Sequence, residues 1–139
     1  MTPVIHSSAI FPKTAPAQLY SIFVDSAKHK AATGMSAKVT GKRGAKWSAF
    51  GGRIRGTNLL LVPGRKIVQT WRSSQWKKSD SDSILIVTFE KAPGGARVEL
   101  AHVGVPAHDH RGVTEGWTKY YWEPWEKYFS AKKGFRKAE

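Results

Sequence analysis

The stretch that decides the fold is residues 83–130, SILIVTFEKAPGGARVELAHVGVPAHDHRGVTEGWTKYYWEPWEKYFS, in which a strand-like hairpin precedes a segment with helical spacing. The run Ser83–Glu90 is rich in Ile, Leu, Val and Phe, and a proline and two glycines follow shortly after it. A turn signal between two apolar runs is typical of a β-hairpin, so Ala96–Val105 is predicted to return as the partner strand.

The segment His110–Ser130 is predicted to be one long helix. Its apolar side chains recur at helical spacing and fall near one face: Val113, Trp117, Tyr120, Tyr121, Pro124 and Tyr128. Proline has no N–H to donate to the carbonyl of Tyr120, so we expect a kink near Pro124. This helix is the only element long enough to cover a sheet with a single buried face. The space between them is either packed solid or hollow enough for a ligand.

The residues before the hairpin add further strands and, near the N-terminus, two short helices. Val4–Phe11 has the composition of a first strand. Ala15-Pro16-Ala17-Gln18 is a helix start with proline in the first turn, and Asp25 or Ser26 caps a second helix that Gly34 ends. The predicted fold is therefore α+β, with two short helices after the first strand. Its curved antiparallel sheet of about six to seven strands wraps on the long C-terminal helix.

The charge is strongly positive and unevenly distributed. Lys and Arg total 23 and Asp and Glu total 10, so the net charge is +13. No acidic residue occurs between Ser26 and Ser79, where 13 basic residues stand, and the rest of the chain is neutral. This asymmetry indicates an anionic partner, which is a nucleic acid, an acidic protein surface or a lipid surface. The alternative is a basic, well-solvated face without a partner.

Composition excludes several classes of protein. The chain has no cysteine, which rules out disulfides, thiolate metal sites and cysteine nucleophiles. The longest aliphatic run, Leu59–Val62, is far too short to span a membrane, and residues 1–16 lack the pattern of a signal peptide. We therefore expect one soluble, cytoplasmic domain over residues 1–139, with a frayed basic tail at residues 131–139.

Several short motifs in a fixed order resemble a known family. They are Gly51-Gly52-Arg53-Ile54-Arg55-Gly56, Trp71-Arg72 with Trp76, Val103-Gly104-Val105-Pro106 and Glu115-Gly116-Trp117 with Tyr120-Tyr121. From about Ala37 to Phe129 the chain resembles the C-terminal domain of the activator of the heat-shock protein 90 ATPase. That domain belongs to the AHSA-type branch of the START/SRPBCC superfamily, so the resemblance implies the helix-grip fold. The eukaryotic co-chaperone carries a separate N-terminal domain that these residues do not match, so the resemblance does not carry over its full role.

The resemblance and the predicted fold together favour a non-catalytic binding domain. The superfamily binds hydrophobic ligands between sheet and helix, so we expect a cavity there for a small apolar or amphipathic ligand. The expected wall residues are Phe50, Ile54, Trp71, Leu85, Val87, Val98, Leu100, Trp117 and Tyr121. A register slip of one residue would move some of them to the other face of the sheet.

The alternative is a protein-interaction module that resembles a co-chaperone. It would dock an acidic partner, such as a heat-shock protein 90 homologue, through a basic face. The residues expected on that face are Lys42, Arg43, Lys46, Arg53 and Arg55. Binding through such a face weakens with ionic strength, whereas cavity binding hardly changes.

Other functions are less favoured by the residues present. Trp47 and Trp76 stand among lysines in a pattern that stacks single-stranded nucleic acid, but no nucleic-acid-binding motif accompanies them. His102, His108 and His110 suggest a metal site, yet the loop favours a helix-capping role for Asp109 and solvated histidines. No nucleophile motif is present, so catalysis is not favoured, although general acid–base chemistry stays open. We predict no metal and no cofactor.

Overall fold

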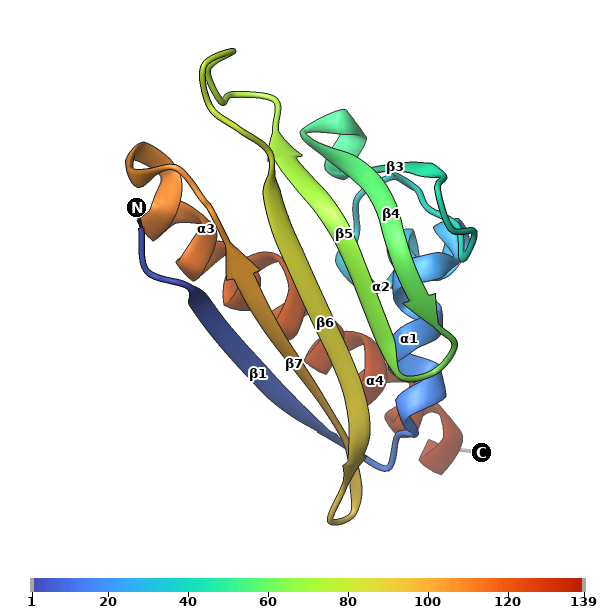
Figure 1. Ribbon diagram of the computed structural model, residues 1–139. Helices are drawn as coiled ribbons and strands as arrows, with labels where there is room; N and C mark the ends of the chain where they lie inside the picture. The colour runs from blue at the N-terminus through green and yellow to red at the C-terminus, as the bar shows by residue number, and fades with distance from the viewer. Residues whose placement is uncertain (1, 139) are drawn as a thin grey trace.

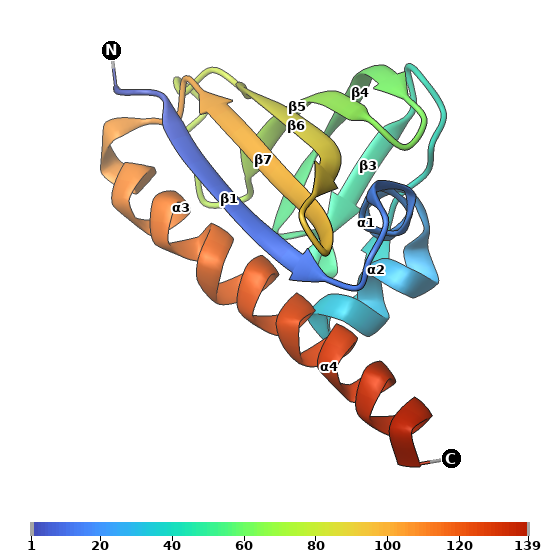
Figure 2. The same cartoon turned by 90° about the horizontal axis from the view of Figure 1, so that it is seen from below.

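In the computed structural model, which describes residues 2–138 and the side chains of residues 2–131, helices cover one face of a single antiparallel sheet (Figures 1 and 2). The strands are β1 (Ile5–Pro12), β2 (Ala37–Lys38), β3 (Lys46–Ala49), β4 (Ile54–Val62), β5 (Lys66–Ser73), β6 (Ser83–Ala92) and β7 (Gly95–Val103). The helices are α1 (Pro16–Val24), α2 (Ser26–Thr33), α3 (His110–Gly116) and α4 (Glu123–Ala138), with a π-helix, η3 (Trp117–Trp122), between the last two. Single 3₁₀ turns are η1 (Phe50–Gly52) and η2 (Ala107–Asp109).

The seven strands lie in the order β1-β7-β6-β5-β4-β3-β2. Each neighbouring pair is antiparallel, and the predicted hairpin is the β6–β7 pair, in register from Ile84 opposite Val103 to Ala92 opposite Gly95. Leu85, Val87 and Phe89 alternate with more exposed residues along β6 and are buried beneath the helices. This confirms the α+β helix-grip architecture and the predicted hairpin.

The two short helices begin and end at the predicted signals. The Gln18 side chain accepts a hydrogen bond from the Ala15 N–H at 2.7 Å, and the Asp25 carboxylate accepts one from the Lys28 N–H at 2.9 Å. Each bond satisfies an N–H that the first helical turn leaves without a partner. Gly34 ends α2 with φ of 83°, a left-handed conformation that glycine adopts at little cost.

The long C-terminal helix differs from its prediction in two ways. A π-helix over Trp117–Trp122 ends two residues before Pro124, near which we expected a kink. This segment closes with a wider turn, from the Glu123 N–H to the Thr118 carbonyl, and Figure 2 shows one continuous helix. The helix also continues past Ser130 to Ala138. Whether residues 131–139 fray stays a prediction, since the side chains from position 132 onward lie outside the described part. Within the described residues, no helix is both long and apolar enough to cross a membrane.

Gly56 is the glycine whose missing side chain the sheet requires. A Cβ atom there would lie 1.8 Å from the Thr70 carbonyl oxygen and 2.7 Å from the Trp47 indole nitrogen, which itself donates a hydrogen bond to that carbonyl at 3.2 Å. Gly51 and Gly52 lie in the η1 turn before β4. The register shift in β4 lies between Asn58 and Leu60.

Gly56→Ala is therefore expected to destabilise the fold by about 1–3 kcal/mol, the usual cost of forcing extra atoms into a packed site. Gly41→Ala is the matched control, because its Cβ would meet Val24 at an ordinary 3.6 Å. Urea unfolding followed by tryptophan fluorescence measures both. Equal stability of the two variants would contradict the close approach at Gly56.

Candidate functional site

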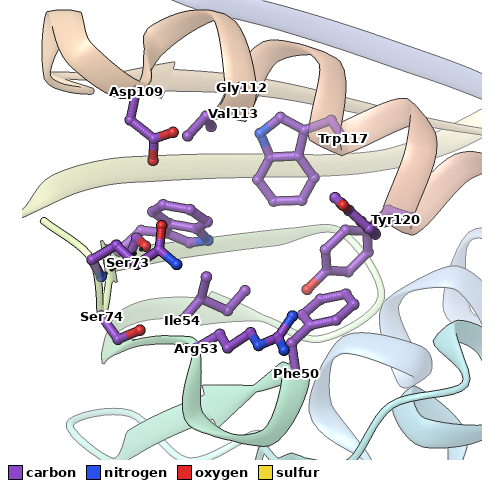
Figure 3. A pocket seen from close by; sticks show the side chains of 14 residues that line it. Phe50, Arg53, Ile54, Ser73, Ser74, Asp109, Gly112, Val113, Trp117 and Tyr120 are labelled. Atoms are coloured by element: carbon purple, nitrogen blue, oxygen red, sulfur yellow. Dashed lines mark hydrogen bonds between the residues drawn. The ribbon is translucent and has the colours of Figure 1, made fainter.

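A pocket of about 310 Å³ opens between the sheet and the long helix, beside the ends of β4 and β5. Its apolar wall consists of Phe50, Ile54, Trp71, Val113, Trp117, Tyr120 and Tyr121. Its polar wall consists of Arg53, Ser73, Ser74, Gln75 and Asp109. Figure 3 shows Asp109 and Trp117 entering from the helix and Arg53 and Phe50 entering from the opposite side. A pocket with aromatic walls, and with a cation and an anion on opposite sides, suits an apolar molecule with a polar end.

The predicted cavity wall divides into two groups in the structure. Phe50, Ile54, Trp71, Trp117 and Tyr121 line the pocket. The other four, Leu85, Val87, Val98 and Leu100, are not among its lining residues, although each is buried on the same face of the sheet. The strand alternation therefore placed all of them on the covered face, but the hollow lies only at the β4–β5 end.

A chain of buried hydrogen bonds links the floor of the pocket to the sheet. The Trp117 N–H donates to His102 Nδ1 at 3.3 Å, which leaves the ring proton on Nε2. His102 Nε2–H then faces Ser83 Oγ at 2.8 Å, and the Ser83 hydroxyl donates to the Trp71 carbonyl at 2.7 Å. Ser83 and His102 are fully buried. Burial, with a smaller contribution from the charge of His110, lowers the pKa of His102 to about 3.

A second buried histidine lies behind the pocket, on α2. His29 Nε2 lies 3.3 Å from the Tyr121 hydroxyl, and its ring meets those of Phe23 and Phe50 edge-on. Its Nδ1 has no hydrogen-bond partner among the described residues. Burial lowers the pKa of His29 to about 4 and raises that of Tyr121 above its ordinary value. Both side chains are therefore neutral at physiological pH, and their contact packs α2 against the long helix.

The five predicted basic residues do not share one face. Lys46 and Arg55 alternate with the inward-facing Trp47 and Ile54, so they point away from the helices. Arg53 lines the pocket. Lys42 and Arg43 lie in the loop between β2 and β3, which is held by the buried Asn58: its side-chain N–H group donates to the Thr40 and Lys42 carbonyls at 2.9 and 3.2 Å.

Ion pairs are concentrated away from the basic strands. Arg97 pairs with Glu90 at 3.2 Å on β6 and β7, and Arg111 pairs with Glu115 at 3.1 Å on α3. Of the 13 cations between Ser26 and Ser79, only Arg72 forms an ion pair with a described residue, with Asp82 at 3.0 Å. Since β2, β3 and β4 form one edge of the sheet, unpaired positive charge gathers there.

The structure places the residues of three less favoured hypotheses, which are a nucleic-acid site, a metal site and a helix cap at Asp109. Trp47 and Trp76 are both buried, so neither ring is free to stack on a nucleic-acid base. His102, His108 and His110 bind different partners, and the described residues contain no group of three metal-ligating side chains. The capping role expected of Asp109 was wrong: its carboxylate makes no capping hydrogen bond and instead accepts one from the Trp76 N–H at 2.7 Å.

The sequence reasoning missed the pocket residues contributed by loops and by the start of the helix. Ser73 ends β5, Ser74 and Gln75 follow it, and Val113 and Tyr120 come from the helix. Val113 and Tyr120 were assigned to the apolar helix face, so that pattern carried a signal for them. Trp76 and Asp109 are 33 residues apart, and no local pattern predicts that their side chains meet.

Comparison with known proteins shows that the chain is similar in sequence to the members of one family. The family model described as Activator of Hsp90 ATPase homolog 1-like protein matches residues 13–130. The activator of 90 kDa heat shock protein ATPase homolog of Dictyostelium discoideum is 33% identical over 105 residues, covering 76% of this chain and 27% of that protein. The human activator of 90 kDa heat shock protein ATPase homolog 1 is 30% identical over 110 residues, covering 79% of this chain and 32% of that protein. The chain thus spans less than a third of the length of either relative.

Solved structures share the fold. The crystal structure of an HSP90 activator from Plasmodium falciparum matches with a TM-score of 0.81 and 23% identity, covering 93% of this chain and 97% of that chain. The solution structure of the Aha1 dimer from Colwellia psychrerythraea matches with a TM-score of 0.71 and 13% identity, covering 86% of this chain and 90% of that chain. At these identities the likeness is one of architecture.

Proposed function

The chain belongs to the Activator of Hsp90 ATPase homolog 1-like family, and from this premise we propose that it is a protein-interaction domain that binds an acidic surface of an Hsp90-type chaperone. The names of its relatives supply the class of partner. Because the chain covers only a part of the curated relatives, their whole activity is not carried over with the fold. The cytoplasmic location expected from the sequence is compatible with such a partner.

The observation that carries this proposal is the unpaired positive charge at the β2–β4 edge. Lys42, Arg43 and Lys46 are exposed and make no ion pair with the described residues. Cations held close together without counter-charges repel one another, and an acidic partner relieves that repulsion. Long-range attraction of this kind raises the association rate and decreases with salt.

Reversing Lys42, Arg43 and Lys46 to Glu is expected to slow association with the chaperone and to flatten its salt dependence. Surface plasmon resonance at about 50 and 150 mM salt measures both, because the Debye length shortens over that range. The matched control reverses Lys13, Lys91 and Lys127, which are exposed cations outside the acid-free segment, and changes the net charge equally.

Two results would contradict the proposal. The wild-type protein could fail to bind the chaperone at about 150 mM salt, where steering by charge is still measurable. Alternatively, the two triple reversals could slow association equally, which would assign the effect to net charge and not to this edge. A fluorescent oligonucleotide titrated under the same conditions tests nucleic acid as the anionic partner, for which the log–log salt slope falls by about 0.7–0.9 per lost phosphate contact.

The pocket supports a second candidate function, the binding of a small apolar or amphipathic ligand. The supporting observation is that about 310 Å³ stays open between aromatic walls, in the size range of small-molecule sites. Arg53 at one side provides a charge for a ligand with an anionic end. No catalytic role is proposed, since the buried histidines are bound to structural partners and do not face the pocket as a base.

Val113→Phe is expected to weaken binding of an apolar fluorescent probe, 8-anilinonaphthalene-1-sulfonate, because Val113 lines the pocket and a phenyl ring there takes up space that the probe needs. The control is Val4→Phe at a position that is 41% exposed and outside the pocket. Circular dichroism checks that both variants stay folded. Probe binding that survives Val113→Phe undiminished would place the probe elsewhere on the protein.

A further inference from the structure

The face of the sheet turned away from the helices carries a continuous band of apolar side chains. Leu60 of β4 is paired with Val68 of β5, Val68 with Ile86 of β6, and Ile86 with Ala101 of β7. A second row joins Ile84 to Val103. The members of this apolar band are Leu60, Val68, Ile84, Ile86, Ala101 and Val103.

Strand alternation determines which way these side chains point. Ile67, Leu85 and Leu100, their immediate neighbours along three strands, are buried beneath the helices. Successive side chains point to opposite faces of a strand, so the apolar band points outward. Figures 1 and 2 show the helices on the other side of the sheet, and no described element covers the band.

The band is accessible and unusual for its position. Leu60 is 43% exposed and Val103 is 39% exposed. An antiparallel sheet covered on one face only normally presents polar side chains on the other face. Contiguous exposed apolar surface with a charged rim is typical of a site that binds another protein.

The rim of the band next to β3 is basic. Lys46 and Arg55 point outward there, and Arg55 lies opposite Arg72 on the neighbouring strand. Lys66 of β5 stands next to the band, opposite Val62 and Thr88. On the β7 side the outward acids Glu90 and Glu99 both lie near Arg97 and are partly neutralised by it. The surface therefore combines an apolar centre with an excess of positive charge along one side.

We infer that the apolar band and its basic rim, Lys46 and Arg55, form the docking surface for the chaperone. The patch that they contact on the chaperone would be one where apolar side chains lie beside carboxylates. This inference rests on the proposed function and gives it a location. Apolar contacts supply affinity and the rim supplies orientation, a division that protein interfaces commonly show. A second copy of the chain is disfavoured as the occupant, because each copy has a net charge of +13 and the two would repel.

The test compares a double variant, Leu60→Thr/Val103→Thr, with the wild type by calorimetric titration into the full-length Hsp90-type chaperone. Threonine has the β-branched shape that strands favour and places a hydroxyl where each site now has only apolar carbon, and both sites are exposed, so the fold tolerates the change. We expect an affinity loss of about tenfold or more, because Leu60 and Val103 are the exposed large apolar side chains of the band and would contact a partner directly. Ile10→Thr is the matched control: it is 48% exposed, points outward from β1 and lies outside the band, so its affinity should stay within about twofold.

The possible outcomes separate this inference from the proposed function. If the wild type binds and the double variant binds equally well, the docking surface lies elsewhere while the proposed function stands. If the wild type does not bind the chaperone, both are overturned. Analytical ultracentrifugation that finds a dimer dissociated by the double variant would assign the band to a second copy. A third possibility is that the wild type binds vesicles of anionic phospholipid but not the chaperone, and that the double variant loses vesicle binding. That result would assign the band to a membrane surface. Either result would overturn the inference.

Discussion

Trp117→Ala is expected to lower the free energy of unfolding by about 3–5 kcal/mol, the range for removing a large aromatic side chain from a core. Trp117 is 3% exposed and its ring lies 4.8 Å from that of Tyr121 and 6.0 Å from that of Trp122. Its N–H also holds His102 in place. Alanine would remove the packing and leave the buried Nδ1 of His102 without a donor, so two penalties add.

Urea unfolding of Trp117→Ala against Tyr120→Ala provides the measurement and its control. Tyr120 belongs to the same helix and lines the same pocket but is 50% exposed, so its loss should cost much less. Trp117→Phe separates the hydrogen bond from the ring, with an expected cost of about 1 kcal/mol for the bond. A loss below about 1 kcal/mol for Trp117→Ala would show that the helix does not depend on this contact.

Lowering the pH from 8 to 4 is expected to destabilise the protein by about 6 kcal/mol, from His29 and His102 together. Burial lowers the pKa of His29 to about 4 and that of His102 to about 3, from 6.5 for an unperturbed histidine. The unfolded chain therefore binds more protons than the folded one in the window between these values and 6.5. The stabilisation is fully present above pH 6.5 and is lost as the pH falls through the window, at about 3 kcal/mol for each histidine by pH 4.

Urea unfolding at a series of pH values checks this expectation, and His29→Gln supplies the matched variant. Glutamine stays neutral and keeps a group that can bond to the Tyr121 hydroxyl, so the variant should lose about half of the pH dependence below 6.5. Losses of this size are comparable to the whole stability of a domain, so the wild type should unfold in mild acid. Equal stability at pH 4.5 and 7.5 would contradict the neutral, buried state of both imidazoles.

Local patterns in the sequence were enough to predict the elements and their order. The Ile, Leu, Val and Phe content of Ser83–Glu90 predicted the strand that forms β6, and the residues around Asp25 and Gly34 predicted the bounds of α2. These signals work because hydrogen bonding of the backbone and burial of alternate side chains act between residues close in the chain. Pro124 indicated that the long helix would be irregular near this residue. The sequence did not predict the form of the irregularity, which is a π-helix over Trp117–Trp122.

Contacts between residues far apart in the sequence could not be predicted in this way. His102, Ser83 and Trp117 come from three elements, and their hydrogen bonds required the sheet and helix to be in place. The same holds for Trp47 and Trp76, whose basic neighbours suggested exposure but whose rings pack inside. A side chain surrounded by lysines along the chain can still be surrounded by apolar groups in space.

The sequence by itself therefore determined the α+β architecture, the order of its main elements and the excess of positive charge, because these depend on composition and on short-range periodicity. Only the tertiary structure decided where the sheet and helix leave a pocket, that Arg53 faces it while Lys46 and Arg55 point outward, and that Leu60, Val68, Ile86 and Ala101 meet in one band. Strand order, register and the shift in β4 set these juxtapositions. They result from the packing of the whole chain, in which each pairing depends on all the others.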